Sequence, residues 1–414
     1  EFVAWIIGWD LIIEYAVGNI GVAIAWSGYF RELVGHFGIH MPAWTATDYR
    51  SAHAAFLQLT AAGAAGVDAT TQYLASAWSA APHLFGVPVI INMPAVLVVA
   101  LITVILVIGI KESADANVAM VVLKVAILLF FIAVGVFLIH PHNWTNPDTG
   151  GFNPNGVKGI SAAAAIIFFS YIGFDAVSTA AEETRDPPKD MPFGIIMSLI
   201  ICTVLYIAIS FVMTGMAPWK TLGTADPMIT ALRFAQGPPG LINASRFIVS
   251  LGAVIAMGSV LLVFQLGQPR IFFSMSRDGL LPPVLAKLHP KYKTPYVGTI
   301  LTGIFVAVFA AFANIAEVVD LTNIGTLFAF VLVSAGVIFL RRIEPERHRP
   351  FRVAWVPVTP LISIAACFYL MWQLPTITWI RFIVWLAIGL GLYFTFGYKH
   401  SVLRQRTADR DQAA

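Results

Sequence analysis

The sequence predicts an all-α integral membrane protein. Of its 414 residues, 58% are hydrophobic and only 11% are charged, whereas about a quarter of the residues in a soluble domain are charged. The apolar residues gather in runs of about 20, the length that a helix needs to cross the hydrocarbon core of a bilayer. Because the links between most runs are short, we expect a single transmembrane domain and no large soluble one.

Ten charge-poor runs are predicted to be transmembrane helices. Their expected ranges are 2–30, 88–110, 116–139, 159–181, 194–217, 242–269, 296–315, 319–340, 354–373 and 377–397. If the helices alternate in direction and the 182–191 link is cytoplasmic, most of the 25 Lys and Arg residues fall on the cytoplasmic side. Cytoplasmic loops normally carry this excess. The same orientation makes residues 398–414 a cytoplasmic tail.

The first run carries two acids, Asp10 and Glu14, which are four residues apart and therefore share a helix face. Carboxylates that close repel, so one of them is expected to be protonated or paired. Asp10 is near the cytoplasmic end, where it would cap the helix or reach the surface. Glu14 is deeper, and ionisable groups at that depth usually face a cavity, so it is a candidate cavity residue.

The 31–86 segment is predicted to be an extracellular loop with an interfacial helix within Ala52–Ala65. The four histidines of this loop have no ligand spacing, so no metal site is expected. The sequence begins at Glu1, which already lies in an apolar run and is preceded by neither a start Met nor a signal peptide. An N-terminal piece is therefore expected to be missing from the sequence.

Lys124 lies inside the third run, six residues beyond Val118. At about 1.5 Å per residue it is about 9 Å into the helix, a depth from which a lysine side chain still reaches the surface. The alternative is a buried amine that exchanges protons with its surroundings. Position alone leaves both interpretations open.

The fourth run is interrupted near its middle by Ser-Tyr-Ile-Gly-Phe-Asp, residues 170–175. A carboxylate at this depth costs about 2.5–3.5 kcal/mol on insertion scales, so Asp175 should face protein or water. Gly173 allows the backbone to leave the helix, and opened backbone in a membrane is tolerated only where it lines a cavity. The stretch predicts a solute site of the kind formed by broken helices. The alternative is a packing glycine beside a structural Asp.

Asp190 and Pro192 are expected to start the fifth helix as cap and first-turn proline. Met257, in the sixth run, would project into a central cavity or simply fill the core. The sequence contains no zinc-protease, hydrolase-elbow or nucleotide-loop motif, and its +3 net charge is too small to indicate nucleic acid. Neither an enzyme nor a cofactor is predicted.

Several motifs together resemble one family. They are Gly8–Leu11 with Glu14–Val17, Gly109–Ser113, Phe168–Asp175, Glu182–Thr184, Gly267–Arg270 and Arg277–Pro282. In this order, and across nearly the whole chain, they resemble the bacterial cationic amino acid transporter-like branch of the amino acid–polyamine–organocation superfamily. No single motif is specific, but the set is.

The resemblance implies a leucine-transporter-like fold of twelve helices, in which two inverted five-helix repeats are followed by two more helices. The ten expected helices would be the third to the twelfth. Residues 1–140 would then be the rest of the first repeat, 159–341 the second repeat, and 354–397 the additional pair. The two absent helices would include the first broken one. The resemblance also implies a multi-pass protein of the bacterial inner membrane, and it leaves the oligomeric state open.

The resemblance further implies a substrate site around the opened segment. Its residues would be Phe169, Ser170, Ile172 and Gly173, with Phe174 as a gate, Asp175 as a support, and Glu14 and Met257 approaching from other helices. Lys124 matches the lysine that stands in for a sodium ion in proton-coupled relatives, which favours the buried-amine interpretation.

The sequence therefore predicts a proton-coupled symporter of L-amino acids that works by alternating access. Met257 offers no counter-charge to a guanidinium, which favours neutral substrates, whereas Glu14 favours cationic ones. A cationic amino acid permease and a sodium-coupled or uncoupled exchanger of the same fold are alternatives. A membrane sensor or scaffold that does not transport is another. The expected partners are an amino acid, a proton and the lipid bilayer.

Overall fold

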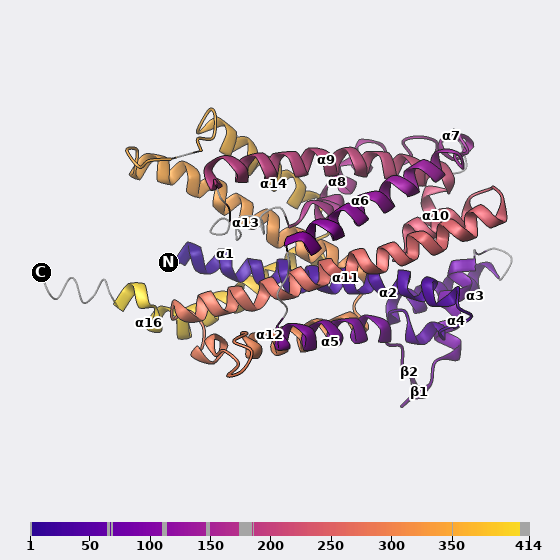
Figure 1. Cartoon of the computed structure of the whole chain (residues 1–414), viewed down its shortest axis with the longest axis horizontal. Coiled ribbons are helices and arrows are strands. Elements are labelled where there is room, and N and C mark those ends of the chain that lie inside the picture. Colours follow the sequence, from indigo (N-terminus) through magenta and orange to yellow (C-terminus); the bar gives the residue numbers. More distant parts are fainter. Residues whose placement is uncertain are drawn as a thin grey trace, which may run out of the picture.

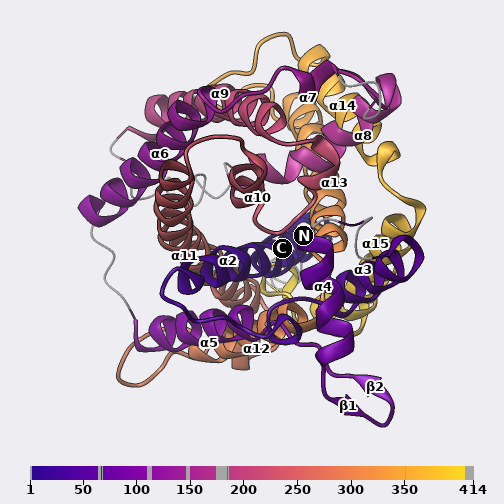
Figure 2. The ribbon, with the colours of Figure 1, turned by 90° about the vertical axis from the view of Figure 1, so that its right-hand side faces the viewer.

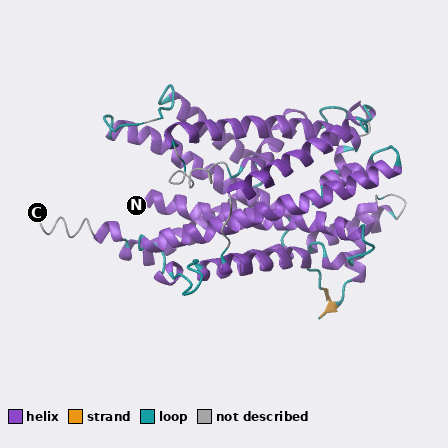
Figure 3. Ribbon diagram, in the orientation of Figure 1, coloured by secondary structure: helices purple, strands orange, loops and turns teal. Residues whose placement is uncertain are grey.

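The chain folds into a bundle of long helices that run along one axis (Figure 1). The structure is a computed structural model, and it describes residues 2–63, 67, 69–109, 114–145, 150–173, 184, 186–349 and 351–405. Figure 3 shows that the described elements are helical except for one small hairpin at an end of the bundle. The prediction of an all-helical protein is confirmed.

The first half of the described chain contains α1 (Phe2–Ile12), α2 (Gly18–Gly35), α3 (Tyr49–Ala62), α4 (Ala69–Ala80), β1 (His83–Leu84), β2 (Val87–Pro88), α5 (Met93–Ile108), α6 (Ala114–Val136), α7 (His142–Thr145) and α8 (Gly156–Ile167). The second half contains α9 (Pro187–Met216), α10 (Pro227–Phe234), α11 (Pro239–Arg277), α12 (Tyr296–Phe312), α13 (Ile315–Ile343), α14 (Val358–Gln373), α15 (Thr376–Leu392) and α16 (Tyr398–His400). A π-helical turn joins α1 to α2, and another joins α15 to α16.

The membrane-crossing helices agree with the predicted runs. Among the described residues, six helices are long and apolar enough to cross a bilayer, namely Phe2–Gly35, Val118–Val136, Pro187–Met216, Pro239–Arg277, Ile315–Ile343 and Thr376–His400. Four shorter apolar helices are Met93–Ile108, Gly156–Tyr171, Tyr296–Phe312 and Val358–Gln373. Each lies on one of the ten predicted runs, because a run of apolar residues is a local property that needs no tertiary information.

The outer surface of the bundle is apolar, as lipid requires. On α5 the exposed side chains include Leu97, Leu101 and Val104, whereas Val99 and Ile102 are buried. Both faces of this helix are therefore hydrophobic, and only one of them packs on protein. A helix that is apolar all round is typical of a membrane span.

The segments that link the helices lie at alternate ends of the bundle, as expected if successive membrane helices alternate in direction. The start of α1, the α13–α14 link and α16 are at one end in Figure 1, and α3, α4, α7 and α10 are at the other. Seen from that second end, α10 lies inside a ring that includes α9, α11 and α13 (Figure 2). α2 also runs through the interior, and it packs extensively on α11.

Three sequence-based boundaries are wrong. The segment before α5, which was predicted to be an extracellular loop with one interfacial helix, holds two helices and a hairpin. α9 begins at Pro187, after Asp186, so Pro192 lies inside the helix and not in its first turn. α11 continues past Pro269 to Arg277. Both α9 and α11 contain a proline within the helix, and both extend into residues that the charge pattern had predicted to be loops.

Candidate functional site

The candidate site is centred on the end of α8. After Ile167 the helix tightens into a 3₁₀ turn, Phe168–Tyr171, and the amide of Ile172 bonds to the carbonyl of Phe169 at 3.2 Å. Ile172 is then extended, with ψ of 139°, and Gly173 has φ of +110°. The chain thus leaves the helix at the position that the sequence predicted. Phe174 and Asp175 lie outside the described residues.

Side chains from distant helices bind the carbonyls that the end of α8 releases. The amide Nδ2 of Asn323, on α13, donates to the carbonyls of Ala165 and Ile166 at 2.8 and 3.0 Å. The hydroxyl of Tyr206, on α9, donates to the carbonyl of Ser170 at 2.5 Å. Backbone acceptors away from water need such partners, so these two side chains stabilise the opened end. Sequence reasoning missed both, although a polar Asn323 within an apolar run was a signal.

Ser170 is one of the residues expected in the substrate site. One of the two lone pairs of its carbonyl is occupied by Tyr206. Phe169 lies against α2, where a Cβ built on Gly21 would be 3.3 Å from its ring. A larger residue at Gly21 would therefore displace Phe169 from this position.

A cavity of about 530 Å³ adjoins the opened segment. Its lining includes five aromatic side chains, those of Trp144, Tyr171, Tyr206, Phe211 and Trp219. The hydroxyl of Tyr171 is 3.1 Å from that of Thr203, which holds the ring in place. An aromatic wall of this kind suits an apolar side chain better than a charged one.

Glu14 is buried close to the broken helix. It lies in the π-helical turn Ile13–Val17, a distortion that is common at functional sites, and only 1% of it is exposed. Thr326 of α13 donates to its Oε2 at 3.0 Å. Thr326 and Asn323 are one helical turn apart on α13, so this helix connects Glu14 to the end of α8. Glu14 is buried in this structure, and its place in a substrate cavity stays a prediction.

Asp10 neither caps the helix nor reaches the surface, so that prediction is wrong. It is 1% exposed, and within the described part of the chain neither carboxylate oxygen has a hydrogen-bond partner. Its neighbour Trp9 donates to the carbonyl of Trp385 and packs against α15. Packing of α1 between other helices places Asp10 in the interior, which a surface-based interpretation could not foresee.

Lys124 lies on α6 and Met257 on α11, and these two helices pack against each other. Lys124 is part-buried, and no described carboxylate is within ion-pair distance of it. A Cβ on Gly252 of α11 would overlap Ile127, one turn after Lys124, so the two helices are in close contact here. Met257 packs with Val254 in the cluster formed by α6, α9, α10 and α11. These contacts place Lys124 beside the middle of α11.

Comparison with known proteins shows the family to which the chain belongs. A family model described as amino acid permease matches residues 1–393. The chain belongs to the amino acid permease family. The permease is 42% identical to the methylthioribose transporter and 42% identical to the branched-chain amino acid permease of Bacillus subtilis, in each case over 98% of this chain and 78% of the relative. It is 34% identical to the vacuolar cationic amino acid transporter 4 of Arabidopsis thaliana, over 84% of this chain and 51% of the relative.

Membership of this family settles the general class of the protein. The permease is a multi-pass cell membrane transporter and not an enzyme. The resemblance derived from the motifs is therefore confirmed.

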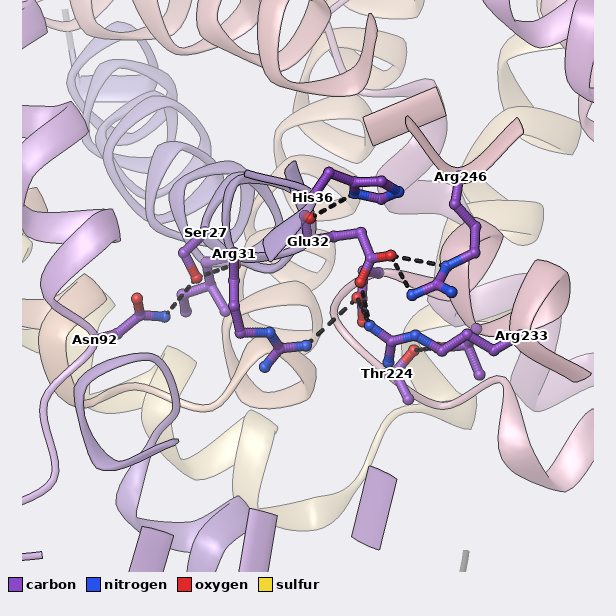
Figure 4. A network of polar contacts seen from close by, with 11 residues as sticks. Ser27, Arg31, Glu32, His36, Asn92, Thr224, Arg233 and Arg246 are labelled. Carbon is purple, nitrogen blue, oxygen red and sulfur yellow. Dashed lines mark hydrogen bonds and ion pairs between the residues drawn. The ribbon is translucent and has the colours of Figure 1, made fainter. Parts of the chain in front are cut away.

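A second polar cluster joins α2, α10 and α11 (Figure 4). Glu32 of α2 accepts hydrogen bonds from Arg233 of α10 and Arg246 of α11. Asp226, which precedes α10, pairs with Arg31 at 3.4 Å and lies 4.0 Å from Arg233. Nothing in the sequence predicted that these residues meet. The cluster joins three separate elements through ion pairs.

Replacing Gly173 by alanine is expected to disfavour the opened conformation. A Cβ at this position would meet no atom within 4 Å, so the cost comes only from the positive φ, which is about 1–2 kcal/mol or more for a residue with a side chain. The opened state should then be depopulated about tenfold. The measurement is the initial rate of substrate uptake, which should fall.

Gly336→Ala is the matched control. Gly336 also has no atom within 4 Å of a built Cβ, but it lies within α13. Alanine in a helix interior is favoured over glycine, so uptake and stability should be kept. Equal uptake rates in the two variants would contradict a role for the backbone at Gly173.

Proposed function

We propose that this permease is a proton-coupled symporter of neutral L-amino acids that works by alternating access. The observation that carries the proposal is the end of α8 at Ile172 and Gly173, within a predicted membrane span. Opened backbone at that depth indicates a solute site. Family membership supports transport as the activity.

The end of α8 suits the ammonium group of an amino acid. α8 and its 3₁₀ turn bring a helix C-terminus to the interior of the membrane, and that end carries partial negative charge. The carbonyl of Ser170 keeps one lone pair after bonding to Tyr206. In the proposal the ammonium binds to this lone pair and to the neighbouring carbonyls. Phe169 covers the substrate from the α2 side.

Proton coupling is assigned to Lys124 in this proposal. Lys124 is part-buried, and among the described residues no carboxylate lies within ion-pair distance of its ammonium group. A lysine beside α11 that gains and loses a proton would change the charge next to the core of the transporter during each cycle. Glu14, held by Thr326, is a second proton acceptor in the same scheme.

The substrate is proposed to be neutral. The cavity beside Tyr171 is largely aromatic, and Met257 packs among apolar residues. One relative at 42% identity is named a branched-chain amino acid permease. A second candidate is an uncharged thio-sugar, because the other relative at 42% identity is named a methylthioribose transporter. A cationic substrate would need Glu14 to become accessible.

Uptake into proteoliposomes tests the function. The purified permease is reconstituted without sodium, with the interior one pH unit more alkaline than the exterior, and radiolabelled leucine, lysine and methylthioribose are added separately. We expect leucine to accumulate and lysine not to. Accumulation of methylthioribose instead would select the second candidate. A sodium requirement, or binding of leucine without flux, would contradict the proposal in favour of an exchanger or a sensor, respectively.

A further inference from the structure

We propose that the pocket between α2, α10 and α11 is an outer subsite that binds the carboxylate of the incoming substrate. The inference rests on the proposed function, since an amino acid brings a carboxylate to this entrance. The pocket has a volume of about 800 Å³. It lies on α10, which is inside the ring of helices at the extracellular end (Figure 2). A solute that approaches the interior from outside would pass it.

The charges around this pocket do not balance. Three guanidinium groups, those of Arg31, Arg233 and Arg246, line it together with the carboxylate of Glu32. The only other described carboxylate in ion-pair contact with these guanidiniums is that of Asp226. Burial also raises the pKa of Asp226, and the nearby guanidiniums of Arg31 and Arg233 only oppose this effect. The pocket therefore has an excess of positive charge.

The carboxylates of this cluster are more deeply buried than its guanidinium groups. The side chains of Glu32 and Asp226 are 6% and 3% exposed, whereas those of Arg233 and Arg246 are 30% and 26% exposed. In Figure 4 the carboxylate of Glu32 lies between the guanidiniums of Arg233 and Arg246. The buried acids hold the guanidiniums in place, and the open side of the cluster presents N–H donors to the pocket.

Most of the N–H donors of the Arg31 guanidinium have no hydrogen-bond partner among the described residues. Its Nη2 is 3.4 Å from Asp226, and within the described part of the chain this is the one hydrogen bond of its guanidinium. The group is also stacked on the ring of Tyr73, with the carbon at its centre 4.6 Å from the ring centroid. Stacking fixes the plane of the guanidinium and leaves its edge free. A planar guanidinium edge is suited to binding a carboxylate through two parallel hydrogen bonds.

The remaining walls indicate a carboxylate with an organic tail. Ile39, Met41 and Phe234 line the same pocket. An inorganic anion gains nothing from such walls, whereas the side chain of an amino acid would pack on them. Positive charge at an entrance also raises the local concentration of anionic groups, so the subsite would help substrate capture rather than the later steps.

Ligand-detected NMR on the purified permease in detergent tests the subsite without transport. The probes are isocaproate, which is leucine without its amino group, and isoamylamine, which is leucine without its carboxylate. We expect isocaproate to bind to the wild type and about tenfold more weakly to Arg31→Gln, the loss of about one charge-assisted hydrogen bond. Arg31→Lys keeps the positive charge but lacks the planar guanidinium edge that donates two parallel hydrogen bonds, so it should give an intermediate affinity.

Arg50→Gln is the matched control, because Arg50 is another extracellular arginine that pairs with Glu317 outside the pocket. It should bind isocaproate as the wild type does. Equal binding of isocaproate by Arg31→Gln and the wild type would overturn the subsite, and so would displacement of isocaproate by phosphate at lower concentration than by leucine. Isocaproate binding that depends on Arg31 in a protein that fails to transport leucine would leave the anion site standing and remove the proposed function.

Discussion

Lys124→Ala is expected to abolish proton-driven accumulation of substrate while leaving exchange of substrate across the membrane intact. With one proton per substrate and no membrane potential, a gradient of one pH unit supports about tenfold accumulation, since one pH unit corresponds to about 1.4 kcal/mol. Without a titratable amine beside α11 the gradient no longer acts on the conformational cycle. The internal and external substrate concentrations should then become equal.

The control variants separate coupling from folding. Lys158→Ala removes an exposed lysine from α8 and should accumulate substrate as the wild type does. Lys124→Arg keeps a positive charge that does not titrate at accessible pH, so it should bind substrate and still fail to accumulate it. Full gradient-driven accumulation by Lys124→Ala would refute the coupling role.

Glu32→Gln is expected to cause the largest loss of stability. The side chain of Glu32 is 6% exposed and holds both Arg233 and Arg246. Removing one partner of a buried ion pair typically costs about 3–5 kcal/mol, and the partial exposure of the two arginines reduces this to about 2–3 kcal/mol. The measurement is the thermal unfolding midpoint of the purified permease, together with its dependence on salt.

Glu344→Gln provides the comparison for that prediction. Glu344 pairs with Arg347 three residues away, and the side chains are 47% and 62% exposed. An exposed pair of this kind contributes about 0–1 kcal/mol, so the unfolding midpoint should hardly change. If the two glutamine variants unfold at the same temperature, the extracellular cluster does not stabilise the fold.

Much of the architecture could be predicted because it depends on local properties. The length of an apolar run is enough to predict a membrane span, and each of the ten predicted runs contains an apolar helix. In the fourth run this helix is α8, and the structure describes only part of that run. The departure of α8 from helical geometry was also predictable, since Gly173 has access to a backbone region that other residues avoid. Neither inference needs to know which helices are neighbours.

The candidate site was only partly predictable for the opposite reason. Tyr206 and Asn323 look like ordinary polar residues in apolar runs, and only the packing of α9 and α13 against α8 directs them to its carbonyls. Glu14 was singled out, but its burial and its bond to Thr326, 312 residues away, were not. The same holds for Glu32 and Arg246, which are 214 residues apart.

The sequence by itself determined that this chain is a helical membrane transporter and where its fourth span opens, because hydrophobic length and glycine conformation act within one segment. The tertiary structure decided what the opened backbone meets. It directs Tyr206 and Asn323 to the released carbonyls, leaves Asp10 buried without a partner among the described residues, and gathers an excess of positive charge at the outer pocket. Hydrogen bonds and ion pairs act over a few ångströms in space, so their partners emerge only when distant helices pack together.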